Sequence, residues 1–234
     1  EIGMHLHAWN NPPEYTLNKI NDQRDYLFEY PKEVMDEKIK VLTSKLEETF
    51  NIKMLSHRSG RWSTDETYFE LLHKYGYKVD CSVTPYMNWE HCVGSTGMLG
   101  SDYRECPTQP YYIYKDILEV PVSIRPIKYF ASDSICSLKT FLHEIKWSGR
   151  VRDAWIRPTK NPSFIALKKV LDKVVQDSDY AMFMLHSSEM MPGGSPSFPD
   201  EQSIEKLYEC IERLFLYAKQ RGYEGCKLSE YKIG

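Results

Sequence analysis

The sequence lacks any long apolar run. Its longest apolar segments fall far short of the ~18 residues needed to cross a bilayer, so no membrane span is predicted in this chain. The opening residues, Glu1-Ile2-Gly3, include no basic segment followed by an apolar one, so no secretory signal is predicted either. Because a strand-like run starts almost at once, we expect the parent protein to extend upstream of Glu1.

The cysteines show no metal-binding or disulfide pattern. The chain has six, spaced irregularly and without a CxxC pair, which excludes zinc-ribbon and thioredoxin spacings. A chain of 234 residues needs no disulfide scaffold. Reduced thiols are therefore the simpler interpretation, and they favour a reducing, cytoplasmic compartment.

A basic stripe is also missing. Lys and Arg together number 30 and Asp and Glu 33, which gives a formal net charge of −3. The densest basic stretch, Arg150, Arg152 and Arg157, is interrupted by Asp153 and Trp155. Nucleic acid is therefore not expected as a partner.

Segments with a strand pattern alternate with segments of helical periodicity. We predict strands over residues 2–7, 52–56, 78–83, 111–114, 118–124, 181–185 and 225–228. We predict helices over residues 33–50, 138–145, 164–175 and 201–221, and one that begins at a capping box over residues 63–66 and ends at Gly76. This alternation predicts an α/β fold with a parallel sheet, which a barrel and an open doubly wound sheet both satisfy. The length predicts one domain spanning residues 1–234.

Residues capable of chemistry stand at the ends of four predicted strands. They are His5 and His7, then His57 and Arg58, then Asp80, and finally His186. In a barrel the carboxyl ends of the strands converge on one face, where active sites are assembled. The placement of these residues therefore favours the barrel over the open sheet.

The pair His5 and His7 is the strongest candidate for metal binding. Residues two apart on a strand project from the same face, so both imidazoles leave the sheet together. Neutral imidazole is a common ligand of zinc and similar ions. The alternative is a pair of structural histidines, which we would favour for an isolated pair but not with Trp9 and the opening Glu1-Ile2-Gly3 alongside.

Five short motifs, taken in order, resemble the polysaccharide deacetylases, the NodB-like carbohydrate esterases. Residues 1–9, EIGMHLHAW, resemble the second motif of that family, and residues 58–62, RSGRW, resemble the third. Residues 79–83, VDCSV, are similar to the fourth, residues 184–188, MLHSS, to the fifth, and residues 119–122, EVPV, to a strand between them. The resemblance covers residues 1 to about 190, and it depends on the order and spacing of the motifs.

The resemblance implies a deformed (β/α)₇ barrel, without its first strand in this chain, that removes acetyl groups from N-acetylated amino sugars of a polysaccharide or its precursor. The family binds a divalent metal, for which we expect zinc, through one aspartate and two histidines. His5 matches the first histidine. The place of the second holds Trp9, so His7 is the substitute ligand and His57 the fallback. The aspartate pair of the first motif has no counterpart in residues 1–234.

Further roles follow from the same resemblance. His186 would donate a proton to the leaving amine, Asp80 would orient His186, and Arg58 would hold the upstream aspartate. Sugar contacts are expected from Trp9, Trp62, Trp89 and Arg61. The alternatives are that His186 only caps a strand, that Asp80 is a turn residue, that Arg58 pairs at the surface and that the tryptophans belong to the core. A catalytically inactive carbohydrate-binding relic and a different metal-dependent hydrolase on a related barrel also stay open.

Overall fold

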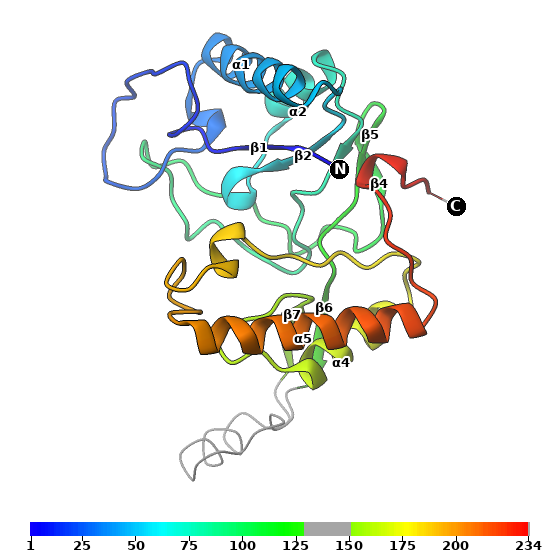
Figure 1. Ribbon diagram of the computed structural model, residues 1–234. Coiled ribbons are helices and arrows are strands. Elements are labelled where there is room, and N and C mark those ends of the chain that lie inside the picture. Colours follow the sequence, from blue (N-terminus) through cyan, green and yellow to red (C-terminus); the bar gives the residue numbers. More distant parts are fainter. Residues whose placement is uncertain (129–150, 234) are drawn as a thin grey trace. The chain divides into compact units, whose positions relative to one another are not determined.

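The structure is a computed structural model that describes residues 1–128 and 151–233 (Figure 1). It divides into two compact units, the first made of Glu1–Val122 with Cys226–Gly234 and the second of Ser123–Gly225. Among the described residues, no helix has the length and apolar character that crossing a bilayer requires. Whether the two units form the single expected domain stays a prediction.

A five-stranded, mostly parallel sheet organises the first unit (Figure 1). Its strands lie in the order β1 (Met4–Leu6), β2 (Ser56–Ser59), β3 (Val79–Asp80), β5 (Ile117–Glu119) and β4 (Tyr111–Tyr114). The first four are parallel, whereas β4 runs antiparallel to β5. The expected α/β class with a largely parallel sheet is confirmed, while closure into a barrel stays a prediction.

Two helices, α1 (Lys32–Phe50) and α2 (Glu66–Lys74), pack together beside this sheet (Figure 1). Met4 and Leu6 alternate with the exposed His5 along β1, and they join a buried cluster that includes Ile39 of α1 and Leu72 of α2. Burial of this cluster supplies the main stabilisation of the unit, because removing apolar surface from water is the dominant favourable term in folding. His5 therefore lies on the opposite face of the strand from this core.

The start of α2 differs from the prediction. Its N-cap is Asp65, whose carboxylate accepts a hydrogen bond of 2.8 Å from the backbone N–H of Tyr68. Ser63 was expected to cap the helix, but its hydroxyl accepts a bond of 3.0 Å from the N–H of Ser101. A loop contact distant in sequence has thus displaced the local capping box.

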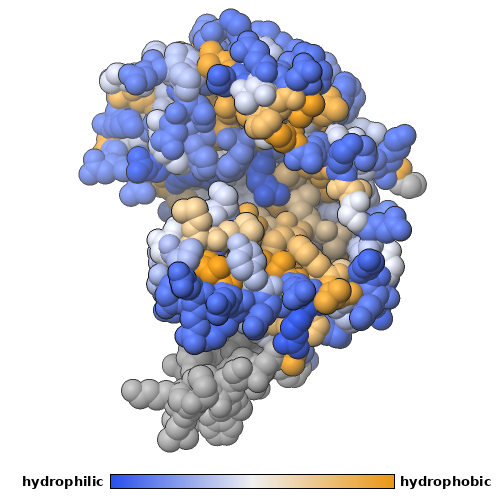
Figure 2. Space-filling model, in the orientation of Figure 1, coloured by the Kyte–Doolittle hydropathy of each residue, from blue (hydrophilic) through white to orange (hydrophobic). Residues whose placement is uncertain are grey.

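The second unit combines a two-stranded antiparallel sheet with two helices. Its strands are β6 (Ile124–Lys128) and β7 (Val151–Trp155), and its helices are α4 (Phe164–Val174) and α5 (Glu201–Gln220). The buried face of α4 packs against Cys210 and Leu214 of α5. Figure 2 also shows apolar side chains at the surface of this unit, and the exposed residues there include Met190, Phe215 and Leu216.

Four predicted strands differ in the structure. The strand expected over residues 52–56 begins only at Ser56 and continues to Ser59 as β2. Residues 181–185 form no regular strand, because Met182 N–H bonds to the Ser123 hydroxyl and Met184 N–H to the Ile156 carbonyl, at 2.8 and 3.1 Å, rather than to one continuous partner. The predicted strand 118–124 divides into β5 and β6 around Pro121, which has no N–H to donate. The last predicted strand, 225–228, is wrong: this region holds only a 3₁₀ turn, η4 (Leu228–Glu230). The predicted helix 138–145 lies outside the described residues.

Candidate functional site

His5 and His7 meet through their ring nitrogens on the face of β1 opposite the core. Their Nε2 atoms are 3.0 Å apart, and the rings stand edge to face with centroids 4.5 Å apart. His5 Nδ1 donates to the backbone carbonyl of Arg58 at 2.8 Å. A carbonyl oxygen only accepts, so Nδ1 carries the proton and Nε2 of neutral His5 presents a lone pair. The two-residue spacing thus brings the imidazoles together.

The environment of His5 keeps its imidazole neutral. Although His5 is exposed by its accessible surface, partial desolvation of the ring lowers its pKa to about 4; the neighbouring His7 adds to this effect, whereas the hydrogen bond to the Arg58 carbonyl opposes it. Neutral imidazole is the form that binds metal ions. His5 is therefore ready to act as a ligand at neutral pH.

The pair fits two positions of a zinc shell. Two nitrogens that each bind a tetrahedral zinc ion at ~2.0–2.1 Å lie about 3.3 Å apart, close to the separation of the two Nε2 atoms. Metal-bound histidines also commonly donate their second N–H to a carbonyl, as His5 does to Arg58. Within the described ranges, however, no three His, Cys, Asp or Glu side chains gather as a metal site. The pair can supply part of a shell, and further ligands have to come from elsewhere.

Gly60 leaves the space in which His7 lies. It follows β2 directly, and a Cβ at this position would approach the Leu6 carbonyl oxygen to 2.5 Å and His7 Nδ1 to 2.7 Å. Both distances are below any ordinary contact, so a side chain would displace the backbone of β1 or the imidazole. The glycine of the RSGRW motif is thus explained by the close approach of His7.

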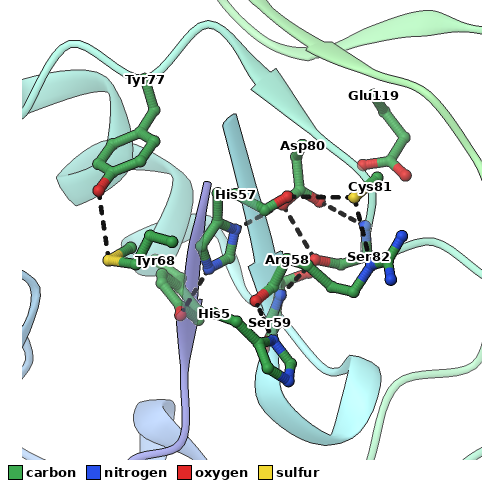
Figure 3. A network of polar contacts seen from close by, with 12 residues as sticks. His5, His57, Arg58, Ser59, Tyr68, Tyr77, Asp80, Cys81, Ser82 and Glu119 are labelled. Carbon is green, nitrogen blue, oxygen red and sulfur yellow. Dashed lines mark hydrogen bonds and ion pairs between the residues drawn. The ribbon is translucent and has the colours of Figure 1, made fainter. Parts of the chain in front are cut away.

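A buried row of polar side chains crosses three neighbouring parallel strands (Figure 3). His57 pairs in register with Asp80, and Asp80 with Glu119. His57 Nδ1 lies 2.5 Å from Asp80 Oδ1, and its Nε2 lies 2.8 Å from the hydroxyl of Tyr68 on α2. The backbone N–H and the hydroxyl of Ser82 also donate to Asp80, at 3.0 and 2.9 Å. All of these residues are fully buried.

The two carboxyl groups of the row hold opposite protonation states. Burial, the largest single effect, acts to raise the pKa of Asp80, but the hydrogen bond and charge of His57 together with the hydrogen bond from the Ser82 N–H outweigh it, so this pKa is lowered. Burial and the adjacent negative charge of Asp80 raise the pKa of Glu119 well above its usual range. Glu119 therefore keeps its proton, while its Oε1 accepts from the N–H of Val83 at 2.9 Å. The row carries an ionised and a neutral carboxyl side by side.

This row changes what can be expected of His57 and Asp80. Both ring nitrogens of His57 are engaged and the side chain is fully buried, so these contacts favour a structural role for His57, and its fallback assignment as a metal ligand stays a prediction without direct support. Asp80 is bonded to His57 and Ser82 of its own unit. His186 belongs to the second unit, so the proposed pairing of Asp80 with His186 stays a prediction.

Two arginines of the third motif have defined contacts. Arg58 Nε donates to Cys81 Sγ at 3.3 Å, and its guanidinium lies 5.3 Å from the ring centroid of Trp62. Arg61 has a left-handed backbone, with φ of 59°, and its guanidinium lies 4.1 Å from the ring centroid of Tyr26. The same guanidinium donates to the carbonyls of Arg24, Cys92 and Val93. These contacts favour a structural role for Arg61, and its predicted role in sugar binding has no direct support.

Of the expected sugar-binding tryptophans, Trp9 lies beside the histidine pair. Its ring contacts that of His7 edge to face, with centroids 4.6 Å apart. Trp9 also lines a shallow, open pocket with residues 19–24, a polar segment apart from Ile20. Trp89 instead donates its indole N–H to the Thr84 hydroxyl at 2.8 Å. Trp9 is therefore the tryptophan that best combines an aromatic face with proximity to the imidazoles.

His186 follows the irregular segment 181–185 in the second unit. Its side chain is about half exposed, and it contacts the buried Glu189 at the start of the short 3₁₀ helix η3 (Ser187–Met190). The sequence pattern placed His186 at a strand end, whereas the structure places it at the cap of this turn. Glu189 and Arg157, which contact it, had only weak signals in the sequence.

Comparisons with known proteins add no family. No protein-family model matches the chain, and no curated protein matches it either. The resemblance to polysaccharide deacetylases therefore depends on the five motifs, and the functional argument depends on the geometry described above.

Proposed function

We propose that this protein is a metal-dependent carbohydrate N-deacetylase. Its substrate would be an N-acetylated amino sugar within a polysaccharide or its precursor, and its fold the deformed (β/α)₇ barrel of that family. The observation that carries the proposal is the convergence of His5 Nε2 and His7 Nε2, with His5 Nδ1 bonded to a backbone carbonyl. This combination is typical of imidazoles that bind a metal ion.

The residues of this chain would have distinct roles in deacetylation. His5 and His7 would hold a divalent ion, with zinc the first expectation. When bound, such an ion polarises a carbonyl group and makes water more acidic. Trp9 would offer its ring to the apolar face of the sugar. His186 would protonate the amine as the C–N bond breaks, because an unprotonated amine anion leaves poorly.

A carbohydrate-binding protein without catalytic activity is the second candidate. Two observations favour it: only two metal-ligand side chains converge among the described residues, and an aromatic ring lines a polar pocket beside them. Such a protein would bind sugar without needing a metal ion. The two candidates therefore differ in a measurable way.

Metal content and acetate release of the full-length protein test the proposal. We expect His5→Ala to abolish bound zinc, measured by elemental analysis, and His186→Ala to keep the zinc while acetate release from acetylated amino-sugar oligomers falls ~10²–10⁴-fold. His73→Ala is the matched control, because His73 pairs with Asp116 elsewhere in the first unit. Equal zinc in the wild type and His5→Ala would overturn the ligand assignment. Metal-independent sugar binding without acetate release would favour the second candidate.

Gly60→Ala offers a milder test of the same site. The added methyl group would displace His7, so we expect zinc affinity to fall by ~10–100-fold, as when the support of a ligand is lost. Gly225→Ala is the control, because a Cβ there meets no atom within 4 Å. Unchanged affinity in Gly60→Ala would argue against His7 as a ligand.

A further inference from the structure

His186 and Glu189 are joined by three hydrogen-bond contacts across one turn. The backbone N–H of His186 donates to Glu189 Oε2 at 2.9 Å, and the imidazole Nδ1 lies 3.1 Å from the same oxygen. In return, the backbone N–H of Glu189 donates to the His186 carbonyl at 3.0 Å. This reciprocal arrangement holds both the backbone and the ring of His186 in one orientation.

Arg157 holds the carboxylate from its other side. Its guanidinium donates to Glu189 Oε1 at 2.8 Å, and the Glu189 side chain is only 6% exposed. Burial alone would raise the pKa of Glu189, but the hydrogen bonds from the His186 N–H and from Arg157 outweigh it and lower this pKa. Glu189 is therefore a carboxylate with both oxygens in use.

The contacts of Glu189 determine which nitrogen of His186 is open. A carboxylate only accepts hydrogen bonds, so Nδ1 carries the proton that lies against Glu189. Arg157 Nη2 also lies 3.3 Å from Nδ1, which is longer than the 3.1 Å from Nδ1 to Glu189 Oε2, so the carboxylate is the nearer partner of Nδ1. The His186 side chain is 52% exposed, and within the described ranges no residue bonds its Nε2. Nε2 is thus the atom left for a substrate.

We propose that Glu189, held by Arg157, is the positioning residue that presents His186 Nε2 as the proton donor. The inference deepens the proposed deacetylase function and rests on it for the identity of the reaction. In that step His186 is doubly protonated: its Nε2–H bond breaks, an N–H bond forms on the leaving nitrogen, and the electron pair of the C–N bond passes to that nitrogen. The ring is left neutral with its proton on Nδ1, hydrogen-bonded to Glu189, and Nε2 then regains a proton from water.

Glu189 takes a role that the motif resemblance assigns to Asp80. The Asp80 carboxylate already accepts from His57 and from the backbone N–H and hydroxyl of Ser82. Glu189 is the carboxylate in direct contact with the His186 ring. An imidazole held at Nδ1 by a carboxylate has a set tautomer and orientation, and such a support commonly decides how well the histidine works.

Glu189→Gln is the decisive variant. Glutamine can keep the capping interaction at this position but removes the charge. We expect kcat to fall by about 10²-fold with KM little changed, because proton transfer rather than sugar binding is affected. Nitrogen NMR of the His186 ring should show the Nδ1–H tautomer in the wild type and a loss of that preference in Glu189→Gln. Glu205→Gln, an exposed glutamate on α5, is the control and should match the wild type in both measurements.

The two measurements separate this inference from the proposed function. A wild-type ring protonated mainly at Nε2, or a Glu189→Gln variant with unchanged tautomer and kcat, would overturn the positioning role. If the tautomer depends on Glu189 but the wild type releases no acetate, the positioning of the ring is supported and the deacetylase proposal fails. Arg157→Gln gives an independent check, because it should weaken the same Nδ1–H preference without altering a residue of η3.

Discussion

Two histidine–carboxylate pairs in this protein share one chemistry but differ in their surroundings. In the first unit, His57 Nδ1 contacts Asp80, and its Nε2 contacts the Tyr68 hydroxyl in a fully buried setting. In the second unit, His186 Nδ1 contacts Glu189, while the ring is half exposed. The carboxylate orients the imidazole in both pairs, so the partner of Nε2 decides whether the pair can meet a substrate.

The difference teaches that an imidazole–carboxylate contact does not by itself identify a catalytic residue. Buried polar groups are stable when every donor and acceptor is satisfied, as around His57. A histidine that transfers protons needs one nitrogen held and the other accessible. By that criterion the pair in the second unit suits chemistry and the row across β2, β3 and β5 suits structure.

Asp80→Ala should have the largest effect on stability. It removes the buried charge that His57 and Ser82 contact and leaves their donors unsatisfied, so we expect the free energy of unfolding of the first unit to fall by about 3–5 kcal/mol. Urea denaturation followed by circular dichroism measures this. Asp102→Ala, which removes a surface pair with Arg104, is the control and should leave the free energy of unfolding close to that of the wild type. A loss at Asp80 no larger than the control would contradict the structural role of the row.

Tyr68→Phe tests the hydrogen-bond contact between the Tyr68 hydroxyl and His57 Nε2. The change removes only the hydroxyl near Nε2 and leaves a buried nitrogen unsatisfied, so we expect a loss of about 1–3 kcal/mol. Tyr112→Phe, on the exposed edge strand β4, should stay within about 0.5 kcal/mol of the wild type in the same denaturation experiment. If Tyr68→Phe and Tyr112→Phe lower the free energy of unfolding equally little, the hydroxyl contact at His57 Nε2 does not distinguish His57 from His186.

Glu189→Ala should lower the free energy of unfolding of the second unit by less than Asp80→Ala lowers that of the first unit. It removes a capping interaction of a short turn, and water can replace it around the half-exposed ring, so we expect a loss of about 0.5–2 kcal/mol. Thermal or urea unfolding checks the value, with Glu205→Ala as the exposed control. A fall in the free energy of unfolding as large as that of Asp80→Ala would indicate that the His186–Glu189 pair is structural, like the His57–Asp80 pair.

Glu119→Gln should have the smallest effect, and its sign depends on pH. Because the folded pKa of Glu119 is raised, its contribution is complete below the unfolded value of about 4.3 and is lost as pH rises through the folded value. Glutamine is neutral at every pH and cannot ionise. We therefore expect the variant to match the wild type at pH 4 and to become the more stable protein as pH rises toward 9.

Urea midpoints measured across that pH range test this prediction. Glu48→Gln, at an exposed position of α1, is the control and should follow the wild-type curve. The lowered pKa of Asp80 acts in the opposite direction and only in acid, because its contribution is present above about 3.9 and lost as pH falls through its folded value. A variant curve parallel to the wild type at all pH values would contradict a protonated Glu119.

Local periodicity in the sequence was enough to predict several elements. The helices α1, α4 and α5 lie close to their predicted limits, because their apolar stripes and caps depend on residues a few positions apart. The irregular course of residues 181–185 was missed. A uniformly apolar run fits a buried strand, but whether it pairs as one depends on neighbours such as Ser123 and Ile156, which are distant in sequence.

For the candidate site, too, some features follow from sequence spacing and others only from tertiary contacts. Sequence spacing alone determined that His5 and His7 share a face, because strand geometry has a period of two. Only the tertiary structure decided that the Tyr68 hydroxyl of α2 contacts His57 Nε2. It also decided that His57, Asp80 and Glu119 lie side by side, because strand register joins residues 23 and 39 positions apart. Sequence also contained Glu189 three residues after His186, yet its role became evident only when Arg157, 32 residues away, was found on its other oxygen. Local geometry follows from the order of residues, whereas the partner that completes a polar contact is chosen by packing.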